Sequence, residues 1–143
     1  MDITPAAPIS VLGFDFGTRR IGVAVGNTLM RVARPVSTLE IRERDARFAA
    51  IAALIAQWHA GHLVVGIPVH ADGVQHAMTW QARRFARQLG GRFALPVSEV
   101  DERHTSEIAR AEAIGSGREG RAQRDAEAAR IILQAWFDEQ PAA

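Results

Sequence analysis

The sequence contains no cysteine and no long apolar run. The absence of cysteine excludes disulfide bonds and thiolate metal sites, which fits a cytoplasmic protein. A membrane-spanning helix needs roughly 18 consecutive apolar residues, and no stretch approaches that length. The first ten residues, MDITPAAPIS, have neither a basic start nor an apolar stretch, so they do not resemble a secretory signal peptide. We therefore expect a cytoplasmic protein with no membrane partner.

Lysine is also absent, so all 17 basic residues are arginines, and the formal net charge is +1. A guanidinium group binds phosphate with two parallel hydrogen bonds, which an ammonium group cannot do. However, the loss of lysine beside abundant alanine is also what a GC-rich genome produces. The composition alone therefore does not indicate a nucleic-acid partner.

The chain has 143 residues, of which 48% are hydrophobic and 23% are charged. These values are ordinary for a soluble domain that buries a core of its own. Neither an internal repeat nor a linker divides the chain. We expect a single domain over residues 1–143, with loose tails at 1–8 and 139–143.

Three strands are predicted in the first part of the chain. The run Ile9–Phe16 is apolar on both faces, as in a strand at the centre of a sheet. A two-residue turn leads to a second strand over Arg20–Gly26, and strands joined this tightly pair as a hairpin. A third strand over Arg31–Leu39 contains Pro35, which favours a position at the sheet edge.

Helices and strands alternate in the rest of the chain. Apolar residues at helical spacing predict one helix that ends at Gly61 and a second, over 77–89, that ends at Gly90 and Gly91. The glycine-rich segment Gly115–Gly120 should be mobile. The remaining expected elements are strands at 62–67 and 97–101 and helices at 105–114 and 122–138.

This order of elements predicts an α/β fold built on a mixed five-stranded sheet. The first three strands should be antiparallel to their neighbours. Right-handed crossovers should place the fourth and fifth strands parallel to the first, with helices on both faces of the sheet. In sheets of this kind, ligands bind at the carboxyl ends of the strands.

Acidic residues stand out at three places in this arrangement. Asp15 lies in the apolar first strand, where an unpaired carboxylate would cost several kcal/mol of desolvation free energy. Asp101 and Glu102 close the fifth strand, and they point to opposite sides if the strand continues. Asp125 begins the face of the last helix that should pack on the sheet. Each acid also has a purely structural explanation, because such residues cap turns and helix N-termini.

Taken together, the acids favour a metal site. Carboxylates from a central strand, a neighbouring strand end and the last helix can meet at one point, and such ligands suit Mg²⁺ or Mn²⁺. Two such ions can stabilise the attacking and the leaving oxygen of a phosphodiester. Cysteine is absent and the five histidines lack zinc-site spacing, so zinc is disfavoured.

Four segments, in order, resemble the motifs of the YqgF-type family of Holliday-junction-resolvase-like, pre-16S rRNA nucleases. They are GFDFGTRRIGVA from Gly13, VVGIP from Val64 followed by Asp72 and Gly73, VDERHT from Val100, and RDAEAARIIL from Arg124. The resemblance spans residues 10–137. It implies an RNase H-like fold and a cytoplasmic nuclease that trims the 5′ end of the precursor of 16S ribosomal RNA.

By this resemblance, Asp15, Glu102 and Asp125 fall on the three metal ligands of the family and would hold two Mg²⁺ or Mn²⁺ ions. Asp101, the other member of the acid pair, would support these ligands without contacting the metal directly. The residues themselves leave open which member of that pair, Asp101 or Glu102, contacts the metal directly. In junction resolvases the second acid follows the fourth strand, where this chain has a Gly-Ile-Pro sequence beginning at Gly66.

Arginines near these acids are candidate phosphate contacts, although each could equally be solvated or form a salt bridge. Two departures from the family pattern leave the substrate contacts open: His70 stands where asparagine is common, and Arg121 where lysine is frequent. The candidate nucleic-acid-binding residues are Arg19, Arg20, Arg103, Arg118, Arg121 and Arg124.

Several functions compete at this stage. The first expectation is a metal-dependent nuclease acting on precursor 16S rRNA, as a monomer or weak homodimer because the core accounts for every apolar stripe. Cleavage of branched DNA and a non-catalytic nucleic-acid-binding module are the alternatives. The sequence Asp-Phe-Gly-Thr from Asp15 also resembles the phosphate-binding turn of actin-like proteins and sugar kinases. Those proteins need two facing domains, and this chain has room for one.

Overall fold

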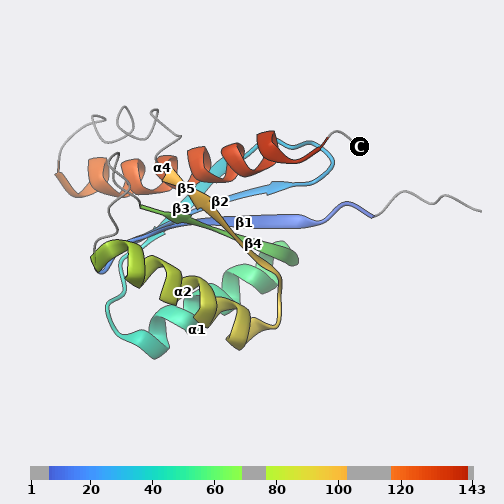
Figure 1. Cartoon of the computed structure of the whole chain (residues 1–143). Coiled ribbons are helices and arrows are strands. Elements are labelled where there is room, and N and C mark those ends of the chain that lie inside the picture. The colour runs from blue at the N-terminus through green and yellow to red at the C-terminus, as the bar shows by residue number, and fades with distance from the viewer. Residues whose placement is uncertain (1–6, 69–76, 103–116, 142–143) are drawn as a thin grey trace, which may run out of the picture.

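The computed structural model describes residues 7–68, 77–102 and 117–141 (Figure 1). Its strands are β1 (Ser10–Phe16), β2 (Ile21–Asn27), β3 (Arg34–Leu39), β4 (Ala60–Ile67) and β5 (Val97–Asp101). Its helices are α1 (Arg44–Trp58), α2 (Ala77–Phe93) and α4 (Gly117–Glu139). The helix expected at 105–114 and the positions of His70, Asp72 and Gly73 lie outside these ranges. None of the described helices is long and apolar enough to cross a membrane.

The five strands form one mixed sheet in the order β3-β2-β1-β4-β5. β2 is antiparallel to both β1 and β3, whereas β4 runs parallel to β1, and β5 runs parallel to β4. β1 is therefore the central strand, and β3, which contains Pro35, lies at one edge. Helices α1 and α2 cover one face of the sheet and α4 covers the other (Figure 1). The predicted α/β fold is confirmed in the number, pairing and direction of its strands.

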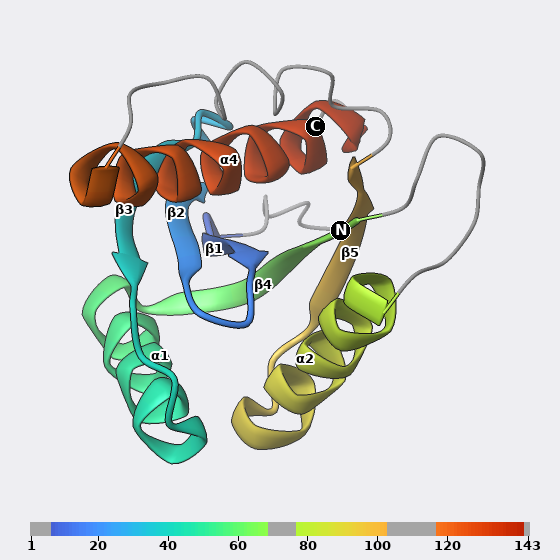
Figure 2. The same cartoon turned by 90° about the vertical axis from the view of Figure 1, so that its left-hand side faces the viewer.

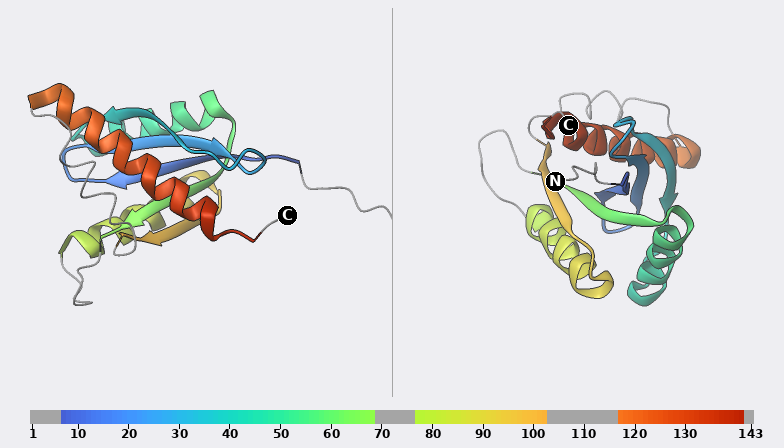
Figure 3. Two further views of the ribbon diagram at one scale, coloured as in Figure 1. Left: turned by 90° about the horizontal axis from the view of Figure 1, so that it is seen from above. Right: turned by 90° about the vertical axis from the view of Figure 1, so that its right-hand side faces the viewer.

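Each face of the sheet has its own apolar core, because side chains alternate along the strands. Leu12 and Phe14 of β1 point toward α1 and α2 and pack there against large side chains such as Phe48 and Phe85. Val11 points to the opposite face, toward the apolar side of α4 that contains Ile132 and Leu133. Seen from above in Figure 3, α4 crosses the strands, and it contacts all five of them.

The predicted end of α1 was wrong. The helix ends at Trp58, because His59 adopts a left-handed conformation with φ of 51°. The His59 N–H is directed at the carbonyl oxygens of Ile55 and Ala56, which satisfies the last turn of the helix. Gly61 is part of β4 instead, since that strand begins at the preceding residue.

The predicted end of α2 was also wrong, because the helix continues through Gly90 and Gly91 to Phe93. Glycine costs about 1 kcal/mol relative to alanine inside a helix. The packing of Phe93 against the core offsets this cost; its ring centroid lies 6.5 Å from that of Phe48. The chain turns only at Ala94, which has a φ of 53°.

The segment expected to be mobile, Gly115–Gly120, is helical from Gly117 onward and forms the first turn of α4. A tertiary contact holds this end of the helix in place. The hydroxyl of Thr38 in β3 donates a hydrogen bond of 2.6 Å to the carbonyl oxygen of Ala122. Long-range packing therefore overrides the weak helix propensity of these glycines.

Candidate active site

Asp15 lies near the end of the central strand β1, on the face of the sheet that α4 covers. Alternation along the strand places it on the same face as Val11 and Gly13. Val11 belongs to the core under α4. A Cβ atom added at Gly13 would lie 2.7 Å from the Cβ of Leu133 in α4. The partly buried Asp15 side chain therefore points toward the α4 side at the carboxyl end of the strand.

Both register neighbours of Asp15 are glycines, Gly22 in β2 and Gly66 in β4. A Cβ atom added at Gly22 would lie 1.8 Å from the backbone oxygen of Asp125. Helix α4 thus lies directly on β2 at this point, and it brings Asp125 beside Asp15. Any larger side chain at position 22 would push this end of α4 away from the sheet.

The glycine on the other side, Gly66, makes room for Glu102. A Cβ atom added at Gly66 would lie 2.3 Å from Ile132 Cδ1 and 3.3 Å from the carboxyl carbon of Glu102. The Glu102 carboxyl group therefore lies over Gly66, on the same face as Asp15. Val100 is buried in the core under α4, so alternation along β5 turns Asp101 to the opposite face.

Asp125 forms an ion pair with Arg20, the residue that precedes β2. The Nε of Arg20 donates to Oδ2 of Asp125 over 2.5 Å, and the two side chains are 28% and 22% exposed. A charge-assisted hydrogen bond of this length and burial is among the stronger polar contacts in a protein. A salt bridge was one of the alternatives to a phosphate contact for Arg20, and a solvated side chain was the other.

A cavity of about 250 Å³ opens at this end of β1. Asp15 and Asp125 both line it, as do Arg19 and Arg20 from the turn between β1 and β2. Met78, in the first turn of α2, contributes an apolar wall. The cavity therefore combines two carboxylates with two guanidinium groups.

The structure does not bring the three acids into one ready metal cluster. Glu102 is absent from the lining of the cavity that contains Asp15 and Asp125. Within residues 7–68, 77–102 and 117–141, no group of three His, Asp or Glu side chains is close enough to hold a metal ion. Asp15, Glu102 and Asp125 are thus neighbours around two glycines, while the Arg20 guanidinium supplies the positive charge beside Asp125.

The other candidate arginines occupy different positions. Arg19 is exposed at the mouth of the cavity, whereas Arg121 and Arg124 lie on the first half of α4 and are partly buried. Arg118 falls in the first turn of that helix, but its side chain, like the whole of Arg103, lies outside the described part of the chain.

Three further residues shape this site although the sequence argument did not assign them a role. Gly22 and Gly66 carry a detectable signal, because glycine inside a strand often marks a close approach of another chain segment. Met78 carries none, since only the tertiary packing of α2 brings it to the cavity.

Comparison with known proteins identifies the family. The model of the RuvX family, described as a Holliday junction resolvase, matches residues 9–139. Two relatives described as "Putative pre-16S rRNA nuclease" are similar over 96% of this chain and 94% of their own length. They come from Paraburkholderia xenovorans (strain LB400), with 50% identity, and Paraburkholderia phytofirmans (strain DSM 17436 / LMG 22146 / PsJN), with 52% identity.

Solved structures show the same fold at low sequence identity. Thermus thermophilus RuvC in complex with a Holliday junction substrate covers 90% of this chain and 94% of its own, with a TM-score of 0.59 and 13% identity. The yeast mitochondrial Holliday junction resolvase Ydc2 covers 89% of this chain and 77% of its own, with a TM-score of 0.53 and 11% identity. These matches confirm the RNase H-like fold, and the match over residues 9–139 together with about 50% identity to full-length relatives means that the chain belongs to the RuvX (YqgF-type) family.

Proposed function

We propose that the chain is a metal-dependent nuclease whose ions are held by Asp15, Glu102 and Asp125. One observation carries the proposal: Asp15 lies near the end of the central strand between two glycines, with Asp125 lying over one and Glu102 over the other. Three carboxylates at the carboxyl edge of an α/β sheet form a site for hard divalent cations. Glu102, rather than Asp101, is the ligand in this proposal, because it lies on the α4 face with Asp15.

The residues present suit Mg²⁺ or Mn²⁺, both of which prefer carboxylate oxygens. When bound, two such ions activate a water molecule and neutralise the charge that develops on the leaving oxygen of a phosphodiester. The protein contributes the three carboxylates and a cavity whose Met78 wall excludes water from one side.

Arg20 has two alternating partners in this proposal. In the structure its Nε lies 2.5 Å from Oδ2 of Asp125, whose charge it neutralises. If divalent ions were held by that carboxylate, Arg20 would be available to a phosphate in the same cavity, because a guanidinium group binds phosphate with high geometric specificity. Arg19 lies at the same mouth, and Arg121 and Arg124 lie along α4. We expect these arginines, with Arg103 and Arg118, to position the strand.

The substrate we propose is RNA, namely the precursor of 16S ribosomal RNA named in the description of the two Paraburkholderia relatives. Ribosome assembly in the cytoplasm is the matching location. A four-way DNA junction needs two coordinated cuts, usually made by a symmetric dimer. We expect this chain to act as a monomer or weak homodimer, so single cuts in RNA should dominate.

The test uses purified protein with a model precursor RNA and a four-way DNA junction at equal concentration, in Mg²⁺, in Mn²⁺ and with chelator. We expect Asp15→Asn, Glu102→Gln and Asp125→Asn to lower RNA cleavage by more than about a hundredfold, which exceeds the usual cost of an outer-sphere change. Asp138→Asn is the matched control, because Asp138 is an exposed acid at the far end of α4.

Three outcomes would contradict this function. Wild-type turnover in any of the three acid variants would remove that acid from the metal site. RNA binding without cleavage in any metal would favour a non-catalytic binding module. Faster, paired and symmetric cuts in the DNA junction would replace RNA with branched DNA as the substrate, while leaving the metal site in place.

A further inference from the structure

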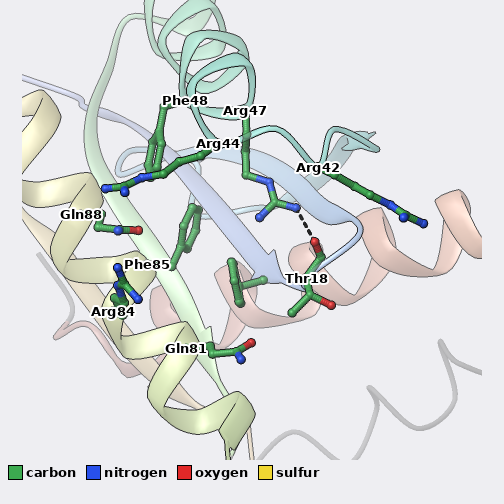
Figure 4. Close-up of a pocket in the computed structure, with 10 residues that line it drawn as sticks. Thr18, Arg42, Arg44, Arg47, Phe48, Gln81, Arg84, Phe85 and Gln88 are labelled. Atoms are coloured by element: carbon green, nitrogen blue, oxygen red, sulfur yellow. Dashed lines mark hydrogen bonds between the residues drawn. The ribbon is translucent and has the colours of Figure 1, made fainter.

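A second cavity, of about 350 Å³, lies between α1 and α2, on the face of the sheet opposite α4 (Figure 4). Among the residues that the structure describes, four arginines line it and no acidic residue does. We infer that this cavity, here called the arginine pocket, binds a phosphate-bearing segment of the RNA strand that continues from the cleaved bond. This inference rests on the proposed nuclease function and adds a substrate subsite to it.

Both helices present a matching stripe to the arginine pocket. Arg44, Arg47 and Phe48 occupy positions i, i+3 and i+4 of α1, and Arg84 and Gln88 lie four residues apart on α2. Residues at these spacings share one face of a helix. Figure 4 shows Arg44 and Arg84 pointing into the space between the helices, Arg47 directed at Thr18 at its edge, and Arg42 pointing away from it. The charge therefore converges on one space, which is where an anion would bind.

Of the four arginines that line the pocket, Arg47 is anchored, Arg44 and Arg84 are available, and Arg42 points away. Arg47 donates hydrogen bonds to the carbonyl oxygens of Ile41 (2.9 Å) and Thr18 (2.8 Å), so its position is fixed. Partial burial lowers the pKa of Arg47, which means that its charge is poorly compensated by water. Arg44 and Arg84 are exposed, and no carboxylate among the described residues forms an ion pair with either.

The nearest acids along the chain are already committed to other contacts. The Glu43 carboxylate accepts hydrogen bonds from the N–H groups of Asp45 and Ala46 and thereby caps α1. Oδ1 of Asp45 lies 3.9 Å from Nη2 of Arg92. Neither acid lines the pocket. An unbalanced cluster of guanidinium groups repels itself, and a phosphate anion relieves that repulsion.

Continuity with the acidic site favours a polynucleotide strand over a separate small anion. Phe16 and Thr18 line both the arginine pocket and the cavity that contains Asp15. The β1–β2 turn is therefore a shared wall between the two cavities. A strand held at Asp15 can pass over this turn at the carboxyl edge of the sheet and place a neighbouring phosphate between Arg44 and Arg84.

The remaining lining suits the sugar and base of a nucleotide. The phenyl groups of Phe16, Phe48 and Phe85 form an apolar floor, which lowers the local dielectric constant and strengthens the arginine–phosphate attraction. Gln81 and Gln88 add amide groups that both donate and accept hydrogen bonds without adding charge.

The first test measures RNA binding independently of cleavage. The double variant Arg44→Gln/Arg84→Gln is compared with Arg34→Gln/Arg87→Gln, which removes the same charge from two exposed arginines outside the pocket. Both are made in the Asp15→Asn protein, and binding of single-stranded RNA is followed by fluorescence anisotropy at several salt concentrations. The slope of log K against log salt is negative, and loss of two phosphate contacts should reduce its magnitude by about 1.4, at roughly 0.7 per phosphate on a single strand.

The control pair, Arg34→Gln/Arg87→Gln, should reduce the magnitude of that slope by less than half as much as the pocket pair, Arg44→Gln/Arg84→Gln. An equal fall for both pairs would mean that the arginines act only through net charge, and an unchanged slope for the pocket pair would mean that RNA does not reach it. Either result overturns the inference. All four substituted arginines are exposed, so circular dichroism should show the same fold in each variant as in the Asp15→Asn protein.

Two further measurements separate this inference from the proposed nuclease function. In the protein that retains Asp15, the pocket pair should raise KM for RNA about tenfold while kcat changes little, because uniform binding is lost. If the wild type cleaves no RNA, the nuclease proposal fails, but the salt slopes still decide whether the pocket binds RNA. If a nucleoside monophosphate binds the pocket while RNA binding ignores the pocket pair, the site takes free nucleotides and the strand path is wrong.

Discussion

The two faces of the sheet are packed in different ways. On one face, α4 lies so close that glycines at positions 22 and 66 are needed beneath it, and its own buried residues include Ala126 and Ala129. On the other face, bulky side chains such as Phe14, Phe48 and Phe85 hold α1 and α2 off the strands, and Figure 2 shows these two helices diverging.

This difference sets the chemistry of each face. Close approach of α4 places Asp125 over Gly22, beside Asp15, and the Glu102 carboxyl group lies over Gly66; these are the carboxylates that we propose to bind cations. The wider spacing on the other face leaves room between α1 and α2, and the long arginine side chains that fill it favour anions. A phosphodiester chain needs both kinds of surface, since its scissile phosphate needs cations and its neighbouring phosphates need arginines.

The largest effect should come from filling the space under α4. Gly22→Ala places a Cβ atom where the Asp125 backbone oxygen lies, at a separation of 1.8 Å. Overpacking of this kind costs about 1–3 kcal/mol or more, and here the obstacle is backbone that cannot rotate away. We expect a lower free energy of unfolding by urea denaturation, together with loss of nuclease activity because Asp125 is displaced.

Gly91→Ala is the matched control for that substitution. Gly91 lies in α2, and a Cβ atom added there meets nothing within 4 Å. The variant should therefore be more stable than the wild type by roughly 0.5–1 kcal/mol, because alanine favours a helix. If both substitutions destabilise equally, the close packing of α4 is not what distinguishes the two faces.

The next effect concerns cation binding at the acids. A ligand that binds only the native state at a hundred times its Kd stabilises it by about 2.7 kcal/mol. Mn²⁺ or Mg²⁺ should raise the melting temperature of the wild type, and should do so far less in Asp15→Asn. Calorimetric melting with and without the ion measures this. Equal shifts in melting temperature in the two proteins would indicate nonspecific ion effects and would contradict the proposed metal site on the α4 face.

The sequence predicted more about the strands than about the contacts between distant elements. The strand Val97–Asp101 has the predicted bounds, and Asp15 stood out because a carboxylate interrupted an apolar run. Such features are local, with a period of two residues. The Arg20–Asp125 pair joins residues separated by 105 positions, and the shared wall at Phe16 depends on how two helices dock. No local pattern encodes either feature.

A smaller effect tests the proposed exchange of Arg20 between Asp125 and phosphate. Arg20→Gln should lower the ion-free stability by about 1.5 kcal/mol, the value of a hydrogen bond to a charged group. It should also tighten Mn²⁺ binding, measured by titration calorimetry, because the cation no longer competes with a guanidinium for Asp125. RNA cleavage should still fall, since a phosphate contact is lost. Weaker Mn²⁺ binding in this variant would contradict the exchange.

The smallest effect concerns His62 of β4, which lies on the α4 face. Its ring contacts Trp136 of α4 in a tilted arrangement with centroids 4.8 Å apart, and its Nε2 lies 2.8 Å from the Ser98 hydroxyl. Burial lowers the pKa of His62 below its usual 6.5, so the unfolded chain binds a proton more readily than the native protein. The stabilisation is therefore complete above pH 6.5 and is lost as the pH falls through the lowered native pKa.

His62→Gln, which keeps a polar partner for Ser98, should flatten the fall of the melting temperature between neutral and mildly acidic pH. His59→Asn removes an exposed histidine at the end of α1 and should leave that fall unchanged. If His59→Asn flattens the profile as much as His62→Gln does, the acid sensitivity arises outside the interface between α4 and the sheet.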